Sequence, residues 1–468
     1  MKKIIAVTAG LMLAGSIVAS ASAAEITFSG DARARFNYED NYIGLASGAG
    51  IHSTTVPGNQ SENFWNSRVR LQFQINTKGG AYAVGRFRLA DGTWEGNTGN
   101  TVNPPGGGGT GGSVGYASSN TKSNLWADVG YVGVPMGPIT VEAGLGYDDF
   151  TNEFLRAGST DNFTFLRGKY VTDQTTLYAF YEKLRVDPLL ASSSTSTSTV
   201  DFVTGNVTTT TSTTPPTDDQ NDVDQYGVNL TQKFDKNWGL NATVLYRDDQ
   251  TSDDLSGVAV DALVSGKVND IGLWVELAYK EADYQKAGYN SSKEGWSNKS
   301  TTGNDGYGGY VAAKVPLGIA AISFMAGATF DGYTASPDFG GGKQADYAPF
   351  VMLSQPTTKD LGFLGTGVLL GSPDGDAYFV NIAPSVKPSD RLTLTLEGTY
   401  LNAEYGQGTG TVNGKFKDVT SLSIWEVGGI ASYKITDGAA VNAMLGYLNI
   451  EDADNNPFGV GLALDLKF

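Results

Sequence analysis

The chain of 468 residues carries a formal net charge of −17, and only 40% of its residues are hydrophobic. It has no cysteine, which excludes a disulfide framework, a thiolate metal site and a haem-attachment motif. A single histidine limits the catalytic devices available. The acidic balance argues against nucleic acid as a partner, because phosphates require clustered positive surface.

The first 24 residues predict a secretory signal peptide. Lys2 and Lys3 precede an apolar run over residues 4–18, and small residues close the segment at 21–23. We expect cleavage near Ala23 or Ala24. Residues 25–468 then form a single mature domain with a formal charge of −19, because two lysines are removed. The chain is therefore expected to be exported.

Beyond this segment, no uncharged apolar run reaches the roughly 18 to 20 residues that a membrane helix requires. Instead, alternating stretches are separated in turn by short and long connections, the pattern of a closed membrane barrel with short periplasmic turns and long extracellular loops. The short turns lie at 77–80, 135–138, 172–174, 235–237, 269–270, 316–318, 387–390 and 436–438. The long loops lie at 39–62, 91–122, 148–162, 188–222, 250–256, 285–305, 333–375, 404–420 and 451–456.

Eight turns and nine loops separate eighteen strands. The sequence thus predicts an all-β fold, a transmembrane antiparallel β-barrel of about 18 strands, an even number as expected for a single-chain barrel. One error of pairing would give about 16. Within 333–375, residues 347–353 and 363–370 could form another hairpin, but we expect a long surface loop.

The first three predicted strands place six arginines on one face: Arg33, Arg35, Arg68, Arg70, Arg86 and Arg88. Apolar neighbours such as Phe36, Leu71 and Phe87 take the opposite face. Because arginine facing lipid costs several kcal/mol, we predict that the six arginines line the lumen. The alternative is a structural ladder in which they pair with lumen carboxylates such as Asp31.

The loop at 148–162 follows these strands and is rich in acidic residues. Its carboxylates are Asp148, Asp149, Glu153 and Asp161. We predict that this loop folds into the pore and opposes the arginines, which would set up a field across the narrowest section and orient polar solutes. An ordinary solvated loop is the alternative.

Two later segments have unusual composition. The Ser/Thr-rich run at 192–214, within the low-complexity range 188–222, predicts a disordered external loop. The carboxylates of Asp248, Asp249, Asp253 and Asp254 are candidates for a loop-bound Ca²⁺, because hard cations take oxygen ligands. Their spacing lacks the pattern of a calcium loop, so a solvated acidic loop is the alternative, and no other metal or cofactor is predicted.

The later strands indicate which side chains meet lipid. In residues 391–400, Leu394 and Leu396 are predicted to face outward and Glu397 inward. The last eleven residues alternate strictly and end on the apolar face at Phe468. This ending resembles the C-terminal sorting signal of bacterial outer membrane barrels, which implies the barrel-assembly machinery as a partner. Candidates for the interfacial aromatic girdles are Tyr38, Trp65, Trp126, Trp238, Trp274, Tyr279, Tyr400, Trp425, Tyr433 and Phe468.

The chain resembles the outer membrane porins of Gram-negative bacteria. The resemblance rests on the signal peptide and on the segments SGDARARFNYED, NSRVRLQFQI, GRFRLADG, ADVGYVGVPMGPITVEAGLGYDDF and GLALDLKF. It implies that 147–162 is the loop that narrows the channel, with arginines on the facing wall, and that the protein is a passive, water-filled channel and a homotrimer. The family's common arginine after the second glycine of the strand–turn–strand unit is absent, since Tyr147 follows Gly146.

The predicted function is passive diffusion of small hydrophilic solutes and ions across the bacterial outer membrane, in contact with its lipid and lipopolysaccharide. The alternatives are a substrate-specific channel with a saturable binding site, and a structural or adhesive barrel that acts through its loops. An enzyme is not expected, because His52 lies in a polar loop and no Gly-x-Ser-x-Gly unit is nearby.

Overall fold

The computed structural model describes the parts of the chain in which the strands and their short turns lie. These are residues 25–40, 62–94, 125–147, 150–156, 163–185, 193–200, 207–214, 223–249, 255–286, 305–336, 339, 350–353, 376–404, 410–412, 415–417, 421–451 and 456–468. The predicted signal peptide lies outside the described residues, and so does His52 in the first long loop.

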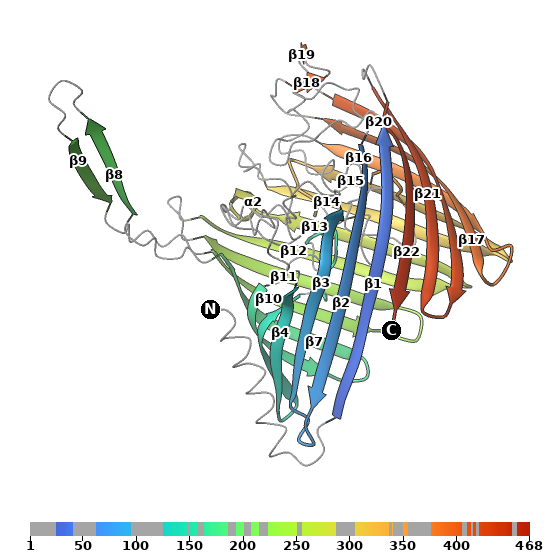
Figure 1. Ribbon diagram of the computed structural model, residues 1–468. Coiled ribbons are helices and arrows are strands. Elements are labelled where there is room, and N and C mark those ends of the chain that lie inside the picture. Colours follow the sequence, from blue (N-terminus) through green and yellow to red (C-terminus); the bar gives the residue numbers. More distant parts are fainter. Residues whose placement is uncertain are drawn as a thin grey trace.

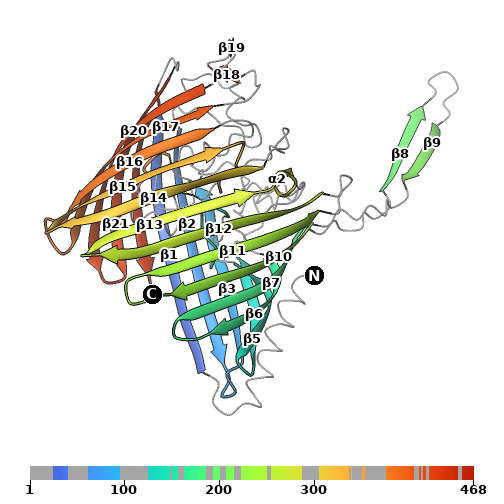
Figure 2. The same cartoon turned by 180° about the vertical axis from the view of Figure 1, so that it is seen from behind.

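Eighteen antiparallel strands form one closed barrel, seen from two sides in Figures 1 and 2. They are β1 (Glu25–Asp40), β2 (Glu62–Asn76), β3 (Tyr82–Trp94), β4 (Leu125–Met136), β5 (Ile139–Gly146), β6 (Phe163–Val171), β7 (Thr175–Arg185), β10 (Val223–Lys233), β11 (Gly239–Asp249), β12 (Leu255–Val268), β13 (Ile271–Lys280), β14 (Gly306–Leu317), β15 (Ala320–Phe330), β16 (Ala377–Val386), β17 (Leu392–Glu404), β20 (Ser421–Thr436), β21 (Ala439–Ile450) and β22 (Phe458–Lys467). Each wall strand pairs with the next one along the chain, and β22 pairs with β1 to close the wall.

The prediction of eighteen strands is confirmed, and each predicted turn and loop falls between the strands that it was expected to separate. Because β15 pairs directly with β16, no strand from 333–375 enters the wall, so an extra hairpin of the wall is excluded there. Residues 363–370 lie outside the described residues. A two-residue turn joins β12 to β13 through Asn269 and Asp270, whose φ angles are 51° and 73°. Asn and Asp tolerate these left-handed angles better than most residues.

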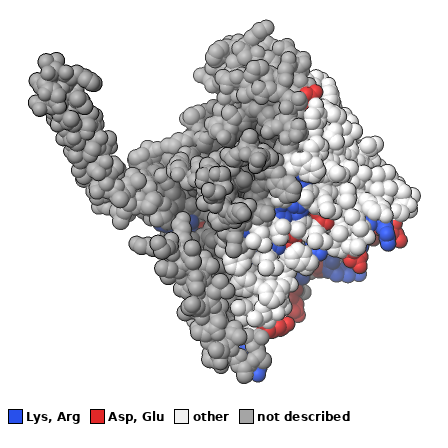
Figure 3. Space-filling view, viewed as in Figure 1, with Lys and Arg blue, Asp and Glu red and all other residues white. Residues whose placement is uncertain are grey.

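The outer face of the barrel is apolar and exposed. Leu277, Leu396 and Val427, on three different strands, are 66%, 67% and 64% exposed. Figure 3 shows that the described wall is mostly uncharged, with charged side chains gathered toward its lower edge, where the short turns lie. A surface of this kind is stable next to lipid rather than water, so the strands span a membrane.

Aromatic rings meet on this outer face, as expected for an interfacial girdle. The ring of Tyr400 lies 6.0 Å from that of Tyr378 and 4.5 Å from that of Trp425. The girdle assignment of Trp274 is wrong, because Trp274 shares the inward parity of the buried Glu276 and packs against the interior cluster. The alternation itself distinguishes the two faces of β13, because Leu273, Val275 and Leu277 lie on one face and Trp274 and Glu276 on the other. The girdle assignment of Trp274 rested on its residue type and not on this parity.

The interior is packed on the side of β14 to β21. Tyr333, Ala335, Phe339 and residues 350–353 join inward residues of the wall in one buried cluster, which includes Phe154 and Phe379. The carboxylate of Glu426 in β20 fixes this segment, since it accepts backbone N–H bonds from Val351 at 2.9 Å, from Leu353 at 3.0 Å and from Met352 between them. These described residues of the long loop therefore lie inside the barrel rather than on its surface.

Several small elements lie outside the wall. In the Ser/Thr-rich run, β8 (Ser193–Val200) and β9 (Val207–Thr214) pair with each other and form a sheet of their own, which projects away from the barrel in Figure 1. The expectation of a disordered loop is wrong for these two stretches. A second small sheet joins β18 (Gly410–Val412) to β19 (Lys415–Lys417), and α2 (Ala282–Lys286) follows β13. Among the described residues, no helix is long and apolar enough to cross a membrane.

The C-terminal residue completes the closure of the wall. The backbone N–H of Gly30 donates to the Phe468 carbonyl at 2.8 Å, and the Phe468 N–H donates to the Gly30 carbonyl at 3.0 Å. The ring of Phe468 fills the space next to Gly30, where an added Cβ would lie 2.6 Å from the ring Cζ. Glycine at this position lets the terminal ring lie flat against the first strand.

Candidate functional site

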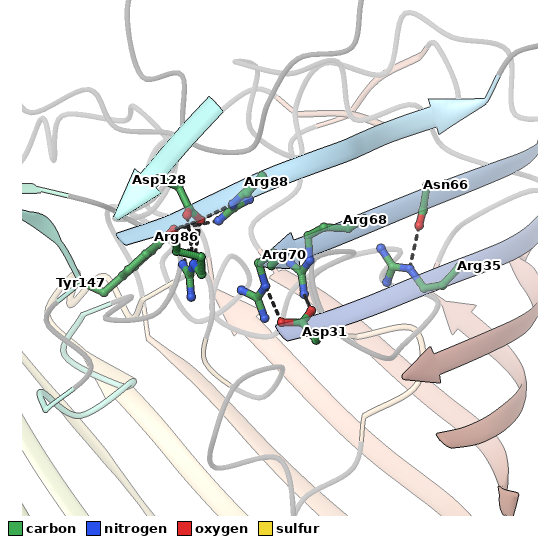
Figure 4. Close-up of polar contacts among 9 residues, drawn as sticks. All are labelled: Asp31, Arg35, Asn66, Arg68, Arg70, Arg86, Arg88, Asp128 and Tyr147. Atoms are coloured by element: carbon green, nitrogen blue, oxygen red, sulfur yellow. Dashed lines mark hydrogen bonds and ion pairs between the residues drawn. The ribbon is translucent and has the colours of Figure 1, made fainter. Parts of the chain in front are cut away.

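Six arginines line one part of the inner wall, on the neighbouring strands β1, β2 and β3. Figure 4 shows all of them except Arg33. The pairing places Arg33 directly opposite Arg68, and Arg70 directly opposite Arg88. We call this group, Arg33, Arg35, Arg68, Arg70, Arg86 and Arg88, the arginine wall. Arg35 and Arg88 are buried, and the exposed Phe28 and Trp65 have the opposite parity, so the arginines face the interior.

Asp31 is the counter-charge at the centre of the arginine wall. It lies opposite Arg70 in the strand register, and its carboxylate pairs with Arg70 Nε at 2.8 Å and with Arg68 Nη2 at 3.5 Å. Arg35 Nε donates to the side-chain oxygen of Asn66 at 2.9 Å. The pairing of arginines with Asp31, which belongs to the structural-ladder alternative, is thus present in the structure.

Asp128 in β4 is a second counter-charge, which the sequence analysis did not identify. The Arg86 Nη2 lies 2.9 Å from its carboxylate, and Arg88 Nε also donates to it. A register shift between Arg86 and Phe87 in the β3–β4 pairing marks a bulge next to Asp128. A bulge re-aims a side chain, and here both Asp128 and Val129 are buried, so strict alternation fails.

Tyr147 joins this ion-pair cluster from the end of β5. Its hydroxyl accepts a hydrogen bond from Arg88 Nη2 at 2.8 Å and donates one to Asp128 Oδ2 at 3.1 Å. Burial raises the pKa of Tyr147, so the hydroxyl keeps the proton that it donates. Figure 4 shows Asp128 held between the two arginines and Tyr147.

The segment 150–156 lies inside the barrel, against the strands that follow the arginine wall. The Asn152 side chain donates to Asp261 at 2.6 Å, and the backbone carbonyl of Phe150 accepts from the side chains of Asn229 and Asn241 at 3.3 and 2.8 Å. These partners belong to β10, β11 and β12, so this segment packs on their inner faces.

The far end of this segment is also anchored. Arg156, which is 1% exposed, pairs with Glu182 of β7 at 2.6 Å. The carbonyl of Phe154 accepts from the Tyr333 hydroxyl at 3.2 Å, and the two rings stack with centroids 5.2 Å apart. Of the four predicted acidic residues, only Glu153 is placed, and it is buried. Asp148, Asp149 and Asp161 lie outside the described residues, so their opposition to the arginine wall stays a prediction.

Arg167 in β6 holds the base of the segment. Its guanidinium donates to Glu142 of β5, which also accepts from the Tyr82 hydroxyl, and its Nη1 donates to the Tyr147 carbonyl at 3.2 Å. The guanidinium lies 5.5 Å from the centroid of the Phe150 ring. Arg167 thus contacts both Tyr147, at the end of β5, and Phe150, at the start of the interior segment.

The two candidate calcium ligands that the structure describes do not converge. Asp248 and Asp249 are adjacent in β11, and adjacent strand residues point to opposite faces, so their carboxylates cannot both bind one ion. Asp253 and Asp254 lie outside the described residues. In the part of the chain that the structure describes, no group of three or more His, Cys, Asp or Glu side chains is arranged to hold a metal. Binding of Ca²⁺ at this loop stays a prediction.

The fold defines the class of protein: a closed antiparallel barrel of the outer membrane type. No protein-family model matches the chain, and no curated protein sequence matches it. Solved structures do. OccAB1 of Acinetobacter baumannii superimposes with a TM-score of 0.53 at 12% identity, over 95% of this chain and 97% of that one.

Two proteins of Pseudomonas aeruginosa are similar to the same degree. OccK8 (OprE) has a TM-score of 0.53 at 13% identity, over 95% of this chain and 98% of its own. The outer membrane protein OpdK has a TM-score of 0.53 at 10% identity, over 94% and 98%. At such low sequence identity, the structural similarity is evidence for the fold alone.

Proposed function

We propose that this protein is a channel of the bacterial outer membrane through which small hydrophilic solutes and ions diffuse passively. The observation that supports this most strongly is the contrast between the two faces of one closed wall. Its outer face exposes large apolar side chains, while its inner face holds six arginines with their counter-charges. Buried charge of this density is costly unless water or solute can solvate it.

The segment 150–156 supports a constriction. It packs on the inner faces of β10 to β12, whereas the arginine wall lies on β1 to β3. Solutes would pass between these two surfaces, close to the arginines. This role needs no chemistry, and we propose no enzymatic activity. The homotrimer and the contacts with lipopolysaccharide and with the assembly machinery stay predictions.

A substrate-specific channel is the second candidate, and the register of the arginine wall favours it. Arg33 and Arg68 lie directly opposite each other on neighbouring strands, where like charges repel. Asp31, which pairs with Arg68, and Asp465, which lies directly opposite Arg33, offset part of this repulsion. An anionic solute that bound between the two arginines would offset more of it. Such a channel would transport its solute with saturable kinetics, unlike a diffusion pore.

Single-channel recording of the refolded protein in a planar bilayer tests the proposal. Stepwise ohmic currents in KCl, with a reversal potential across a KCl gradient, are the expected result. Saturation of the current by one anion would favour the substrate-specific channel. Absence of current from a verified folded barrel would overturn both and leave a structural or adhesive barrel.

A further inference from the structure

Seven basic residues occupy inward-facing positions next to the short turns. We call them the basic collar: Lys169, Lys233, Lys267, Lys314, Arg391, Lys434 and Lys467. Their orientation follows from the alternation of burial. In β12, for example, Gly257, Ala259 and Asp261 are buried, and Lys267 has the same parity. The collar spans strands from β6 to β22, whereas the arginine wall lies on β1 to β3. The two groups meet where Lys467 of β22 lies directly opposite Asp31 of β1.

Two further strands support the inward orientation. In β14, Tyr310 and Ala312 are buried and Lys314 shares their parity. In β6, Lys169 Nζ lies 5.6 Å from the centroid of the Tyr178 ring, which stacks inside the barrel on Phe150. The lysines therefore point toward the mouth of the lumen and not toward lipid.

Neighbouring members of the collar are close. Lys267 and Lys314 both lie opposite Gly272, so a single strand separates them. Strands lie about 4.8 Å apart, which puts the two Cα atoms on the order of 10 Å from each other. Gly272 adds no Cβ between them. Two ammonium groups at this distance can contact one multivalent anion together.

A second pair of neighbours lies on β17 and β20. The backbone N–H of Lys434 donates to the carbonyl of Arg391 at 2.7 Å, so the two residues are direct cross-strand neighbours. Like charges in this arrangement are destabilising. Asp437 in the adjacent turn pairs with Lys434 at 2.7 Å and offsets part of this repulsion.

Carboxylates are few on the inward positions near the collar. Among the described residues they include Glu25, Glu142, Asp465 and Asp31, and Asp31 lies directly opposite Lys467. Asp31 is engaged by Arg68 and Arg70. Glu142 is engaged by Arg167, and Asp465 accepts from the side chain of Asn442 at 2.8 Å. The inner rim of this mouth therefore carries an excess of positive charge, although the whole chain is strongly acidic.

We propose that the basic collar is a binding vestibule for small multivalent phosphate anions at the short-turn mouth of the channel. This inference rests on the proposed channel function and adds a solute class to it. Several solvated cations around one opening attract an anion in proportion to its charge, so a polyphosphate is held far more strongly than chloride. The attraction acts at one end of the channel only.

Sided block of single-channel current tests this inference. Sodium tripolyphosphate is added first to one chamber and then to the other while KCl current is recorded. Block is expected from one side at roughly tenfold lower concentration than from the other. In the variant K267Q/K314Q, the blocking concentration on the sensitive side should rise about fivefold. The control K78Q/K236Q removes the same charge from exposed turn lysines of the same rim. It should change the blocking concentration less than about twofold.

Two outcomes would overturn the inference in distinguishable ways. If the channels conduct but are blocked equally from both sides, the collar is contradicted and the channel function stays intact. The same holds if the collar and control variants change the blocking concentration equally. Silent channels from folded protein would overturn the channel function and the collar with it.

Discussion

Asp128 offers the sharpest test of how the arginine wall is held. The substitution Asp128→Asn keeps the shape of the side chain and removes the charge that pairs with Arg86 and Arg88. Both Asp128 and Arg88 are almost fully buried, with side chains 3% and 5% exposed. Removing one partner of a buried pair costs about 3 to 5 kcal/mol, because the remaining charge stays buried without compensation.

Arg86 and the Tyr147 hydroxyl moderate this cost. The side chain of Arg86 is 16% exposed, so water reaches it, and the amide oxygen of Asn can still accept from one donor. We therefore expect Asp128→Asn to lower the free energy of unfolding by about 3 kcal/mol. The measurement is urea unfolding of the barrel in lipid vesicles, followed by tryptophan fluorescence.

Asp31→Asn is the matched control. It is the same substitution on the same wall, and Asp31 also pairs with two arginines, but its side chain is 26% exposed. Solvent screening reduces the expected loss to about 1 kcal/mol. Equal losses for the two variants, or a loss under about 1 kcal/mol for Asp128→Asn, would refute the argument that burial makes Asp128 the principal counter-charge.

Three further predictions follow from the site and the closure of the wall. Replacing Arg33, Arg68 and Arg86 together by Ala should move the reversal potential toward cation preference, and an unchanged potential would exclude these arginines from the conduction path. Arg167→Gln should increase the noise of the open-channel current, because the base of the inserted segment loses its anchor, whereas Arg167→Lys should restore part of the quiet current. Gly30→Val should slow assembly of the folded barrel, seen as delayed heat-modifiable migration on gels, because its side chain meets the Phe468 ring; assembly at the normal rate would contradict the closure role.

The wall of the barrel was predictable from the sequence because each strand must keep one face toward lipid. Period-two alternation and turn residues such as Asn269 and Asp270 therefore mark the strands and their ends. The same logic placed the six arginines on the inner face. Trp274 was assigned to the outer girdle by its residue type, although its parity with Glu276 places it inward, where it packs against the interior cluster.

The counter-charges and the packed interior were harder to predict, for two physical reasons. Asp128 lies at a bulge, which breaks the alternation of the strand. Period-two alternation in the sequence therefore does not show which face its carboxylate takes. Residues 350–353 show no periodic pattern of apolar and polar residues. Their position depends on backbone N–H bonds to Glu426, which is far away in sequence.

The sign of ion selectivity follows from local charge rather than from the total. The chain is strongly acidic, yet the arginine wall sets six cations against Asp31 and Asp128, and the basic collar adds seven more at one mouth. Exposed charges farther than about 8 Å from the conduction path are screened at physiological ionic strength, so acidic residues in remote loops contribute little. The reversal potential should therefore report anion preference, and the preference should weaken as the salt concentration rises. Cation preference at low salt would mean that carboxylates, and not these arginines and lysines, lie next to the path of the ions.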